Sequence, residues 1–198
     1  MGKGKATREM ILSKAAALFN SRGYYGASMA DLMSATGLEK GGIYNHFSSK
    51  DQLALEAFEF AFQTSAEEFS RCMSGRERAS DKLFAFIEAF ENFAANSPIP
   101  GGCPLLNSAV ESDDGHPEMK LRVQIAMDSI LATLEKLIGK GISEGELKPS
   151  TNAQQVARSI VAALEGGIML AKLYSDTAYM DSVAETVRGQ IRAIRVGE

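Results

Sequence analysis

The segment from Ser28 to Lys50 constrains the fold of this chain more than any other stretch. It contains two short amphipathic pieces joined at Ala35-Thr36-Gly37-Leu38, and glycine readily adopts the backbone of a tight bend. The second piece carries basic, amide and aromatic hydroxyl side chains on one side. Two short helices joined in this way form the layout of a helix-turn-helix DNA-binding motif. We therefore expect this segment to bind DNA and the rest of the chain to position it.

The local pattern assigns an inner and an outer side to this motif. Ser28 is followed three residues later by Asp31, a spacing close to a capping box at a helix start. Ile43 and Phe47 lie four residues apart, so both face the preceding helices and seat the third helix on them. The opposite side then presents Lys40, Gly41, Tyr44 and Asn45.

The charge is unevenly divided along the chain, although the whole protein carries a net charge of −4. Residues 1–51 hold seven Lys or Arg and four acidic residues, whereas the remainder holds 14 basic and 21 acidic residues. A basic head on an acidic body directs attraction for DNA phosphates to one end. If no motif accompanied this division of charge, a chance asymmetry would be the alternative explanation.

The rest of the chain predicts a helical protein. Residues 1–6 are interpreted as a flexible basic arm, with Thr7 as the N-cap of the first helix and Gly23 at its end. Glycines 139, 141 and 145 with Pro149 predict a break after the seventh helix. The expected helices cover residues 7–22, 28–36, 48–73, 80–96, 104–112, 117–140, 152–174 and 179–196, and the third helix, between the second and the fourth of these nine, carries Ile43 and Phe47. The fold class is therefore all-α.

Several function classes lack support in the sequence. No apolar run approaches a membrane span and the N-terminus is not signal-like, so we expect a cytoplasmic protein without a membrane partner. Cys72 and Cys103 have no CxxC spacing and there are two histidines, so no metal site and no cofactor are predicted. No nucleophile, base and orienting residue recur at a recognisable spacing. An enzyme using Cys103 or the Asp113-Asp114 pair is the alternative, and the expectation is no enzyme.

The segment resembles the DNA-binding domain of TetR/AcrR-type transcriptional regulators. The resemblance covers about residues 7–53 and is carried by the pattern of a glycine followed by Tyr44, His46, Phe47, Lys50 and Leu53. It implies a three-helix helix-turn-helix DNA-binding domain at residues 1–52 and a helical ligand-binding and dimerisation domain at residues 53–198.

The resemblance also implies roles for individual residues. Ser28 would cap the second helix and touch a phosphate, and Tyr44, His46 and Lys50 would hold the DNA backbone. Lys40, Gly41 and Asn45 would approach base edges, since Lys donates to guanine, Asn pairs with adenine and Gly allows close approach. Each residue has a structural alternative, such as packing or pairing with a neighbouring acid. Glu39 and Gly42 depart from the family pattern at positions where hydroxyl residues are common.

The body is rich in phenylalanine, with eight of the ten occurring between residues 58 and 93. Core packing explains such a cluster, and the functional hypothesis is a pocket for an apolar or aromatic effector. Similar Gly-Cys-Pro-Leu runs border the effector pocket in one branch of the family, and a thiol switch at Cys103 is an alternative trigger. The pocket candidates are Phe58, Phe62, Phe90, Phe93, Cys103, Asn107, Met127 and Met169.

The resemblance implies a homodimer through two C-terminal helices, about 152–174 and 179–196, and an intramolecular hairpin is the alternative. The expected function is a ligand-responsive repressor that binds a palindromic double-stranded DNA operator and is released by a small effector. Alternatives are an activator of the same family, a non-specific DNA-binding protein, and the cysteine-dependent enzyme considered above.

Overall fold

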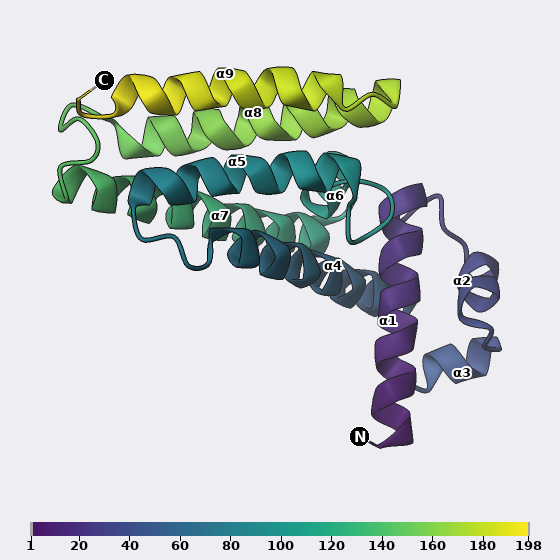
Figure 1. Cartoon of the computed structure of the whole chain (residues 1–198). Coiled ribbons are helices and arrows are strands. Elements are labelled where there is room, and N and C mark those ends of the chain that lie inside the picture. The colour runs from purple at the N-terminus through teal and green to yellow at the C-terminus, as the bar shows by residue number, and fades with distance from the viewer. Residues whose placement is uncertain (1, 198) are drawn as a thin grey trace. The chain divides into compact units, whose positions relative to one another are not determined.

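The computed structural model describes residues 2–197 and folds them almost entirely into helices (Figure 1). The predicted all-α class is confirmed, and an isolated β-bridge joins Leu147 to Arg195. No helix among the described residues is both long and apolar enough to cross a membrane. In this range the helices are α1 (Lys3–Arg22), α2 (Met29–Thr36), α3 (Lys40–Tyr44), α4 (Lys50–Met73), α5 (Ala79–Ala95), α6 (Pro104–Ser112), α7 (Pro117–Ser143), α8 (Ala153–Tyr174) and α9 (Ala178–Ile194).

Local sequence signals explain several helix boundaries. Gly37 follows α2 in the left-handed conformation, with φ 69° and ψ 17°, which a residue with a Cβ atom rarely adopts. Pro104 occupies the first turn of α6, where the absence of its N–H has no cost. The side chain of Asn152 accepts a hydrogen bond from Gln155 N and so caps α8. These boundaries lie at or next to the predicted positions.

Two predictions about helix ends are wrong. The basic arm is not a separate segment, because α1 begins at Lys3 with Gly2 as its N-cap rather than at Thr7. Gly139 and Gly141 do not break the chain, because α7 continues through both glycines to Ser143. A single glycine lowers helix stability by only about 1 kcal/mol, so packing along a long helix outweighs it.

The third helix does not include Phe47, although the sequence analysis placed Phe47 on it together with Ile43. It ends at Tyr44, and Asn45 and His46 form the turn that follows it. Phe47 therefore lies outside the helix, yet its side chain is buried, as predicted from its spacing with Ile43.

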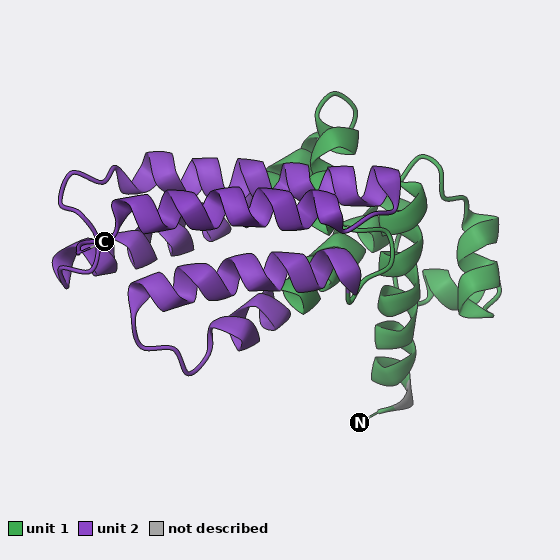
Figure 2. Cartoon of the chain, turned by 45° about the horizontal axis from the view of Figure 1, so that its top comes forward, with its two compact units in different colours: residues 1–65, 98–124 green, residues 66–97, 125–198 purple. Residues whose placement is uncertain are grey.

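Contacts divide the chain into two compact units, coloured separately in Figure 2. Unit 1 contains residues 1–65 and 98–124, and unit 2 contains residues 66–97 and 125–198. The proposed functional division after residue 52 differs from this grouping and stays a prediction.

Unit 1 encloses a core between α1, α2, α3 and the first turns of α4. Leu32 of α2 and Ile43 of α3 are fully or almost fully buried against α1. Leu53 and Ala57 continue this core on α4, which fixes the helix-turn-helix segment against two longer helices. The buried core residues are Ile11, Leu12, Ala15, Ala16, Leu32, Ile43, Phe47, Leu53, Ala57, Ala61 and Ile99.

In unit 2, α8 and α9 lie side by side and both contact α5 (Figure 1). Gly167 of α8 allows the close approach of α9, because an added Cβ would lie 2.8 Å from Met180 Sδ. Gly166 has open space at the same position and has no such role. Arg188 of α9 forms a two-pronged ion pair with Glu91 of α5, and its Nη1–Oε1 distance is 2.8 Å.

Candidate DNA interface

The outer side of α3 is exposed as the sequence predicts. Lys40, Gly41, Tyr44 and Asn45 are all exposed, whereas Ile43 between them is 1% exposed. Lys40 Nζ lies 5.7 Å from the centre of the Tyr44 ring, within the range of a cation–π contact. The helix therefore presents an ammonium group, an amide and a phenol to solvent from a rigidly packed base.

The start of α3 contains Glu39, Gly41 and Gly42, three residues that the sequence analysis singled out. Glu39 is the N-cap residue, but its side chain makes no capping hydrogen bond. An added Cβ at Gly41 would meet no atom within 4 Å, so the surface there is open. At Gly42 the added atom would lie 3.5 Å from Leu38 Cβ, which is ordinary contact.

The predicted capping box at Ser28 is present. Asp31 N donates to Ser28 Oγ at 3.1 Å, and Ser28 N donates to Asp31 Oδ2 at 2.9 Å. The hydrogen bonds from the Ser28 hydroxyl and backbone lower the pKa of the Asp31 carboxyl, and Arg22 beside it acts in the same direction. Ser28 itself is exposed, so its Oγ stands at the surface of the helix start.

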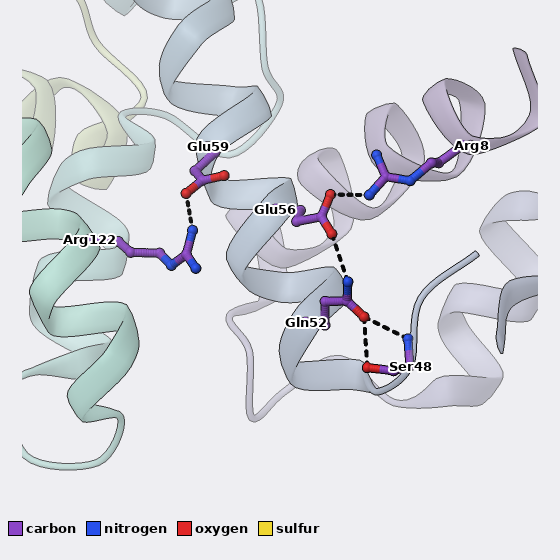
Figure 3. A network of polar contacts seen from close by, with 6 residues as sticks. All are labelled: Arg8, Ser48, Gln52, Glu56, Glu59 and Arg122. Atoms are coloured by element: carbon purple, nitrogen blue, oxygen red, sulfur yellow. Dashed lines mark hydrogen bonds and ion pairs between the residues drawn. The ribbon is translucent and has the colours of Figure 1, made fainter. Parts of the chain in front are cut away.

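A basic residue of α1 supports the chain that follows α3. The Arg8 guanidinium lies 4.7 Å from the centre of the Phe47 ring and forms an ion pair with Glu56 of α4 (Figure 3). Arg8 therefore joins α1 to α4 across Phe47. The ion pair with Glu56 neutralises part of the positive charge of Arg8 within the fold.

A hydrogen-bond network on α4 joins Glu56 to the loop that precedes this helix. Gln52 Nε2 donates to the other Glu56 oxygen at 3.1 Å, while Gln52 Oε1 accepts from Ser48 N and Ser48 Oγ, both at 2.7 Å (Figure 3). One turn further along α4, Glu59 pairs with Arg122 of α7. This network fixes the backbone at Ser48, which directly follows the α3 region.

Lys50 has a partner inside unit 1. Its Nζ donates to the Tyr24 carbonyl oxygen at 2.6 Å and lies 4.2 Å from the centre of the Tyr24 ring. Burial raises the pKa of Tyr24 to about 12, and the hydrogen bond from its hydroxyl to Asp51 acts in the same direction. Lys50 thus ties the start of α4 to the α1–α2 connection, and its predicted phosphate contact remains a proposal. His46 is half-buried in the turn after α3.

The pocket candidates of unit 1 lie in different surroundings. Phe58 is buried and stacks on Phe62 with ring centres 6.3 Å apart. Cys103 is the N-cap residue of α6 and forms no disulfide. Asn107 Nδ2 donates to Asn20 O, Asn20 Oδ1 and Gly101 O at 2.9–3.0 Å, so its amide joins α6 to the end of α1.

The pocket candidates of unit 2 are also dispersed. Phe90 and Phe93 are buried around Phe69, with ring centres 4.9 and 6.0 Å from it, and form part of a packed aromatic cluster. Met127 is half-buried, whereas Met169 is 50% exposed on α8. Within unit 2 the contacts therefore favour core packing for Phe90 and Phe93 and surface exposure for Met169.

Sequence reasoning missed the supporting residues. Arg8, Gln52 and Glu56 hold the α3 region, and the only available signal was the four-residue spacing of Gln52 and Glu56 on one helix face. Within the described chain, no group of three or more His, Cys, Asp or Glu is placed to hold a metal ion.

Comparison with known proteins matches both parts of the chain. Residues 11–57 match the family of bacterial regulatory proteins described as the tetR family, and residues 79–187 match the tetracyclin repressor-like C-terminal domain. The first match contains the capping box and the exposed side of α3 described above. The chain is therefore a helix-turn-helix transcriptional regulator that binds DNA.

Similar proteins extend over nearly the full length. A TetR transcriptional regulator from Chloroflexus aurantiacus is 41% identical, with a TM-score of 0.96 covering 98% of this chain and 99% of that one. A TetR-family regulator from Cytophaga hutchinsonii is 32% identical, with a TM-score of 0.93 covering 100% and 99%. The regulator LmrA from Bacillus subtilis is 29% identical, and the match covers 83% of this chain and 85% of LmrA. This chain belongs to the TetR family of transcriptional regulators.

Proposed function

We propose that this regulator is a repressor that binds a palindromic DNA operator as a homodimer. The observation that carries the proposal is the outer side of α3, where Lys40, Gly41 and Asn45 are exposed above the buried Ile43. Lys is suited to guanine acceptors and Asn to adenine in the major groove, which gives base selectivity. Ser28, Tyr44, His46 and Lys50 are proposed to contact phosphates and set the register.

A solved structure supports the mode of binding. The TetR-family regulator CifR, 21% identical over a fold with a TM-score of 0.80, is complexed with a 26-bp double-strand operator DNA. The repressor assignment is supported by ComR from Escherichia coli, which is 25% identical over 162 residues and is named a transcriptional repressor.

The proposed dimer uses α8 and α9. Within the chain these helices already pair with each other, yet Met169, Leu173 and Tyr174 of α8 are 50–69% exposed. Tyr179 of α9 stacks on Tyr174 with ring centres 4.7 Å apart and extends this apolar surface. A second copy would remove these side chains from water, and a two-fold axis would present two α3 helices to successive major grooves.

We propose a small apolar or aromatic effector as the signal that releases the DNA. An effector shifts DNA affinity only when it binds the DNA-free conformation more tightly than the DNA-bound one. The phenylalanine-rich composition of the body supports an apolar ligand. Thiol modification at Cys103 is the alternative trigger. It would be excluded if an electrophile releases the Cys103→Ser variant from DNA as readily as it releases the parent protein.

Selection of bound sequences from a random DNA pool tests the proposed function. The selected sequences should share two inverted half-sites, and at a stated salt concentration they should bind at least roughly 1,000-fold more tightly than random DNA. Equal binding of selected and random DNA would instead identify a non-specific DNA-binding protein.

Sedimentation of Leu173→Glu tests the dimer surface. The change places a charge in the proposed interface and should shift the protein to monomers. Val110→Glu is the matched control, because Val110 is also 69% exposed but lies on α6. A dimer that persists in Leu173→Glu would contradict the proposed interface.

A further inference from the structure

Glu39, the residue directly before α3, carries a negative charge at the edge of the proposed DNA interface. Its side chain is exposed and makes no capping hydrogen bond with the helix. In the part of the chain that the structure describes, no hydrogen bond or ion pair engages its carboxylate. Within these residues the charge of Glu39 is therefore neither neutralised nor used to hold α3.

The backbone at Glu39 keeps its side chain off the buried side of α3. An ideal helix would place a residue four positions before Ile43 on the same face as Ile43, which is 1% exposed. Glu39 instead has an extended backbone, with φ −68° and ψ 158°, and its side chain lies at the surface. The N-terminal residues of a recognition helix contact base edges in the major groove. The carboxylate thus stands at the end of α3 that is expected to approach the bases.

The ammonium of the next residue does not cancel this charge. Lys40 Nζ lies over the ring of Tyr44, one turn further along α3, at 5.7 Å from the ring centre. Two consecutive residues therefore present an acceptor and a donor separately. Consecutive Cα atoms are about 3.8 Å apart and successive base pairs about 3.4 Å apart, so both side chains reach the same base pair or neighbouring ones.

The chemistry of a carboxylate restricts the base that it can contact. A carboxylate only accepts hydrogen bonds and is repelled by the phosphates, so it needs a donor on a base edge. The major groove offers the N4 amino group of cytosine and the N6 amino group of adenine. The adenine amino group lies beside the acceptor N7, which repels a carboxylate, whereas cytosine itself presents no acceptor in this groove. Cytosine is therefore the base that fits Glu39.

We propose that Glu39 is a specificity-determining residue that accepts a hydrogen bond from the N4 amino group of a cytosine in each operator half-site. This inference rests on the proposed function and adds one base contact to it. The cytosine lies in the base pair contacted by Lys40 or in a neighbouring one. Where no donor stands at that position, the carboxylate lies against DNA without a partner, so Glu39 excludes the wrong bases.

Selected operators in which all four bases are placed at each half-site position test the contact, with affinity measured by fluorescence anisotropy. At one position the parent protein should prefer cytosine over the other bases by roughly fivefold to 100-fold. Glu39→Gln should change the preferred base there to adenine, because a glutamine amide donates to N7 and accepts from the N6 amino group. Glu39→Ala should bind all four bases with similar affinity.

The control is Glu67→Gln, which removes an exposed carboxylate of α4 and changes the net charge by the same amount. It should keep the cytosine preference. Glu39→Gln should unfold at the temperature of the parent protein, since its side chain makes no capping hydrogen bond.

Simple repulsion of phosphates by Glu39 gives a different result. In that case Glu39→Gln would strengthen binding to every sequence equally and would preserve the preferred base at each position, which would overturn the proposal. A parent protein that binds selected and random DNA equally would contradict the proposed function as well, so the two failures are distinguishable.

Discussion

The Glu111 carboxylate of α6 holds the backbone of Tyr24 in the α1–α2 connection, with a Tyr24 N–Oε2 distance of 2.8 Å. Its second oxygen accepts the neighbouring Tyr25 N at 3.0 Å. Gly23 precedes them with φ 77°, and a Cβ there would lie 2.6 Å from Glu111 Oε1. One carboxylate thus fixes the chain that leads into α2.

Glu111→Ala should destabilise the protein by roughly 2–3 kcal/mol, since two backbone donors lose a charged acceptor. At this chain length the loss corresponds to a fall in Tm of about 4–12 °C. Thermal unfolding followed by circular dichroism measures it. Glu118→Ala, which removes an exposed carboxylate paired with Arg122, should change Tm little, and an equal fall in both variants would contradict this role of Glu111.

Glu146 gives unit 2 a pH-dependent contribution to stability. Burial acts to raise the pKa of its carboxyl, but hydrogen bonds from Ser80 N, Ser80 Oγ and Ala79 N, with Arg78 nearby, outweigh burial and lower the pKa from 4.5. A lowered folded-state pKa stabilises above the unfolded value, and this stability is lost as pH falls through the folded-state pKa.

Glu146→Gln should therefore cost roughly 1–3 kcal/mol at pH 7, and the difference from the parent should shrink below about pH 4.5. Urea unfolding at a series of pH values measures both effects. Glu144→Gln is the control because this neighbouring carboxylate is 47% exposed. A pH-independent difference for Glu146→Gln would show that its charge is not the cause.

The two glycines of α7 should respond oppositely to alanine. An added Cβ at Gly139 meets open space, so Gly139→Ala should stabilise the helix by about 0.5–1 kcal/mol. At Gly141 the added atom would lie 2.9 Å from Leu147 and 3.1 Å from Ala79 Cβ, so Gly141→Ala should destabilise by roughly 1–3 kcal/mol. Denaturant unfolding of both variants checks the sign, and a shared sign would refute the packing argument.

Local chemistry made much of the DNA-binding region predictable. The Ser28–Asp31 capping box, the bend at Gly37 and the burial of Ile43 and Phe47 depend on neighbours within a few residues. These features therefore appear in the sequence as spacing and residue type.

The supporting contacts were not predictable in this way. Arg8 meets Glu56 from 48 positions away, and Glu111 meets Tyr24 from 87 positions away. Such pairs arise only when the packing of whole helices is fixed, and nothing in the local pattern marks them. The same reason explains why α7 passes through Gly139 and Gly141, where local propensity predicted a break.

Gly41→Ala tests how closely α3 approaches DNA. The open space around Gly41 means that the variant should fold with equal or slightly greater stability. If the backbone at Gly41 lies against the operator, the added methyl should weaken binding about tenfold or more, whereas Gly139→Ala should not. Fluorescence anisotropy with a selected operator measures both, and unchanged affinity of Gly41→Ala would place Gly41 away from the DNA.

The central claim is that the outer side of α3 recognises the operator. Its most direct test is the operator affinity of the combined variant Lys40→Ala, Tyr44→Phe and Asn45→Ala, measured at a fixed salt concentration beside Lys136→Ala. Lys136 is exposed on α7 and controls for the loss of one positive charge. The account predicts at least roughly a 100-fold loss for the combined variant, since each good base contact contributes about 1–3 kcal/mol, and little change for the control. Operator binding that is unaffected by the three changes together would contradict it.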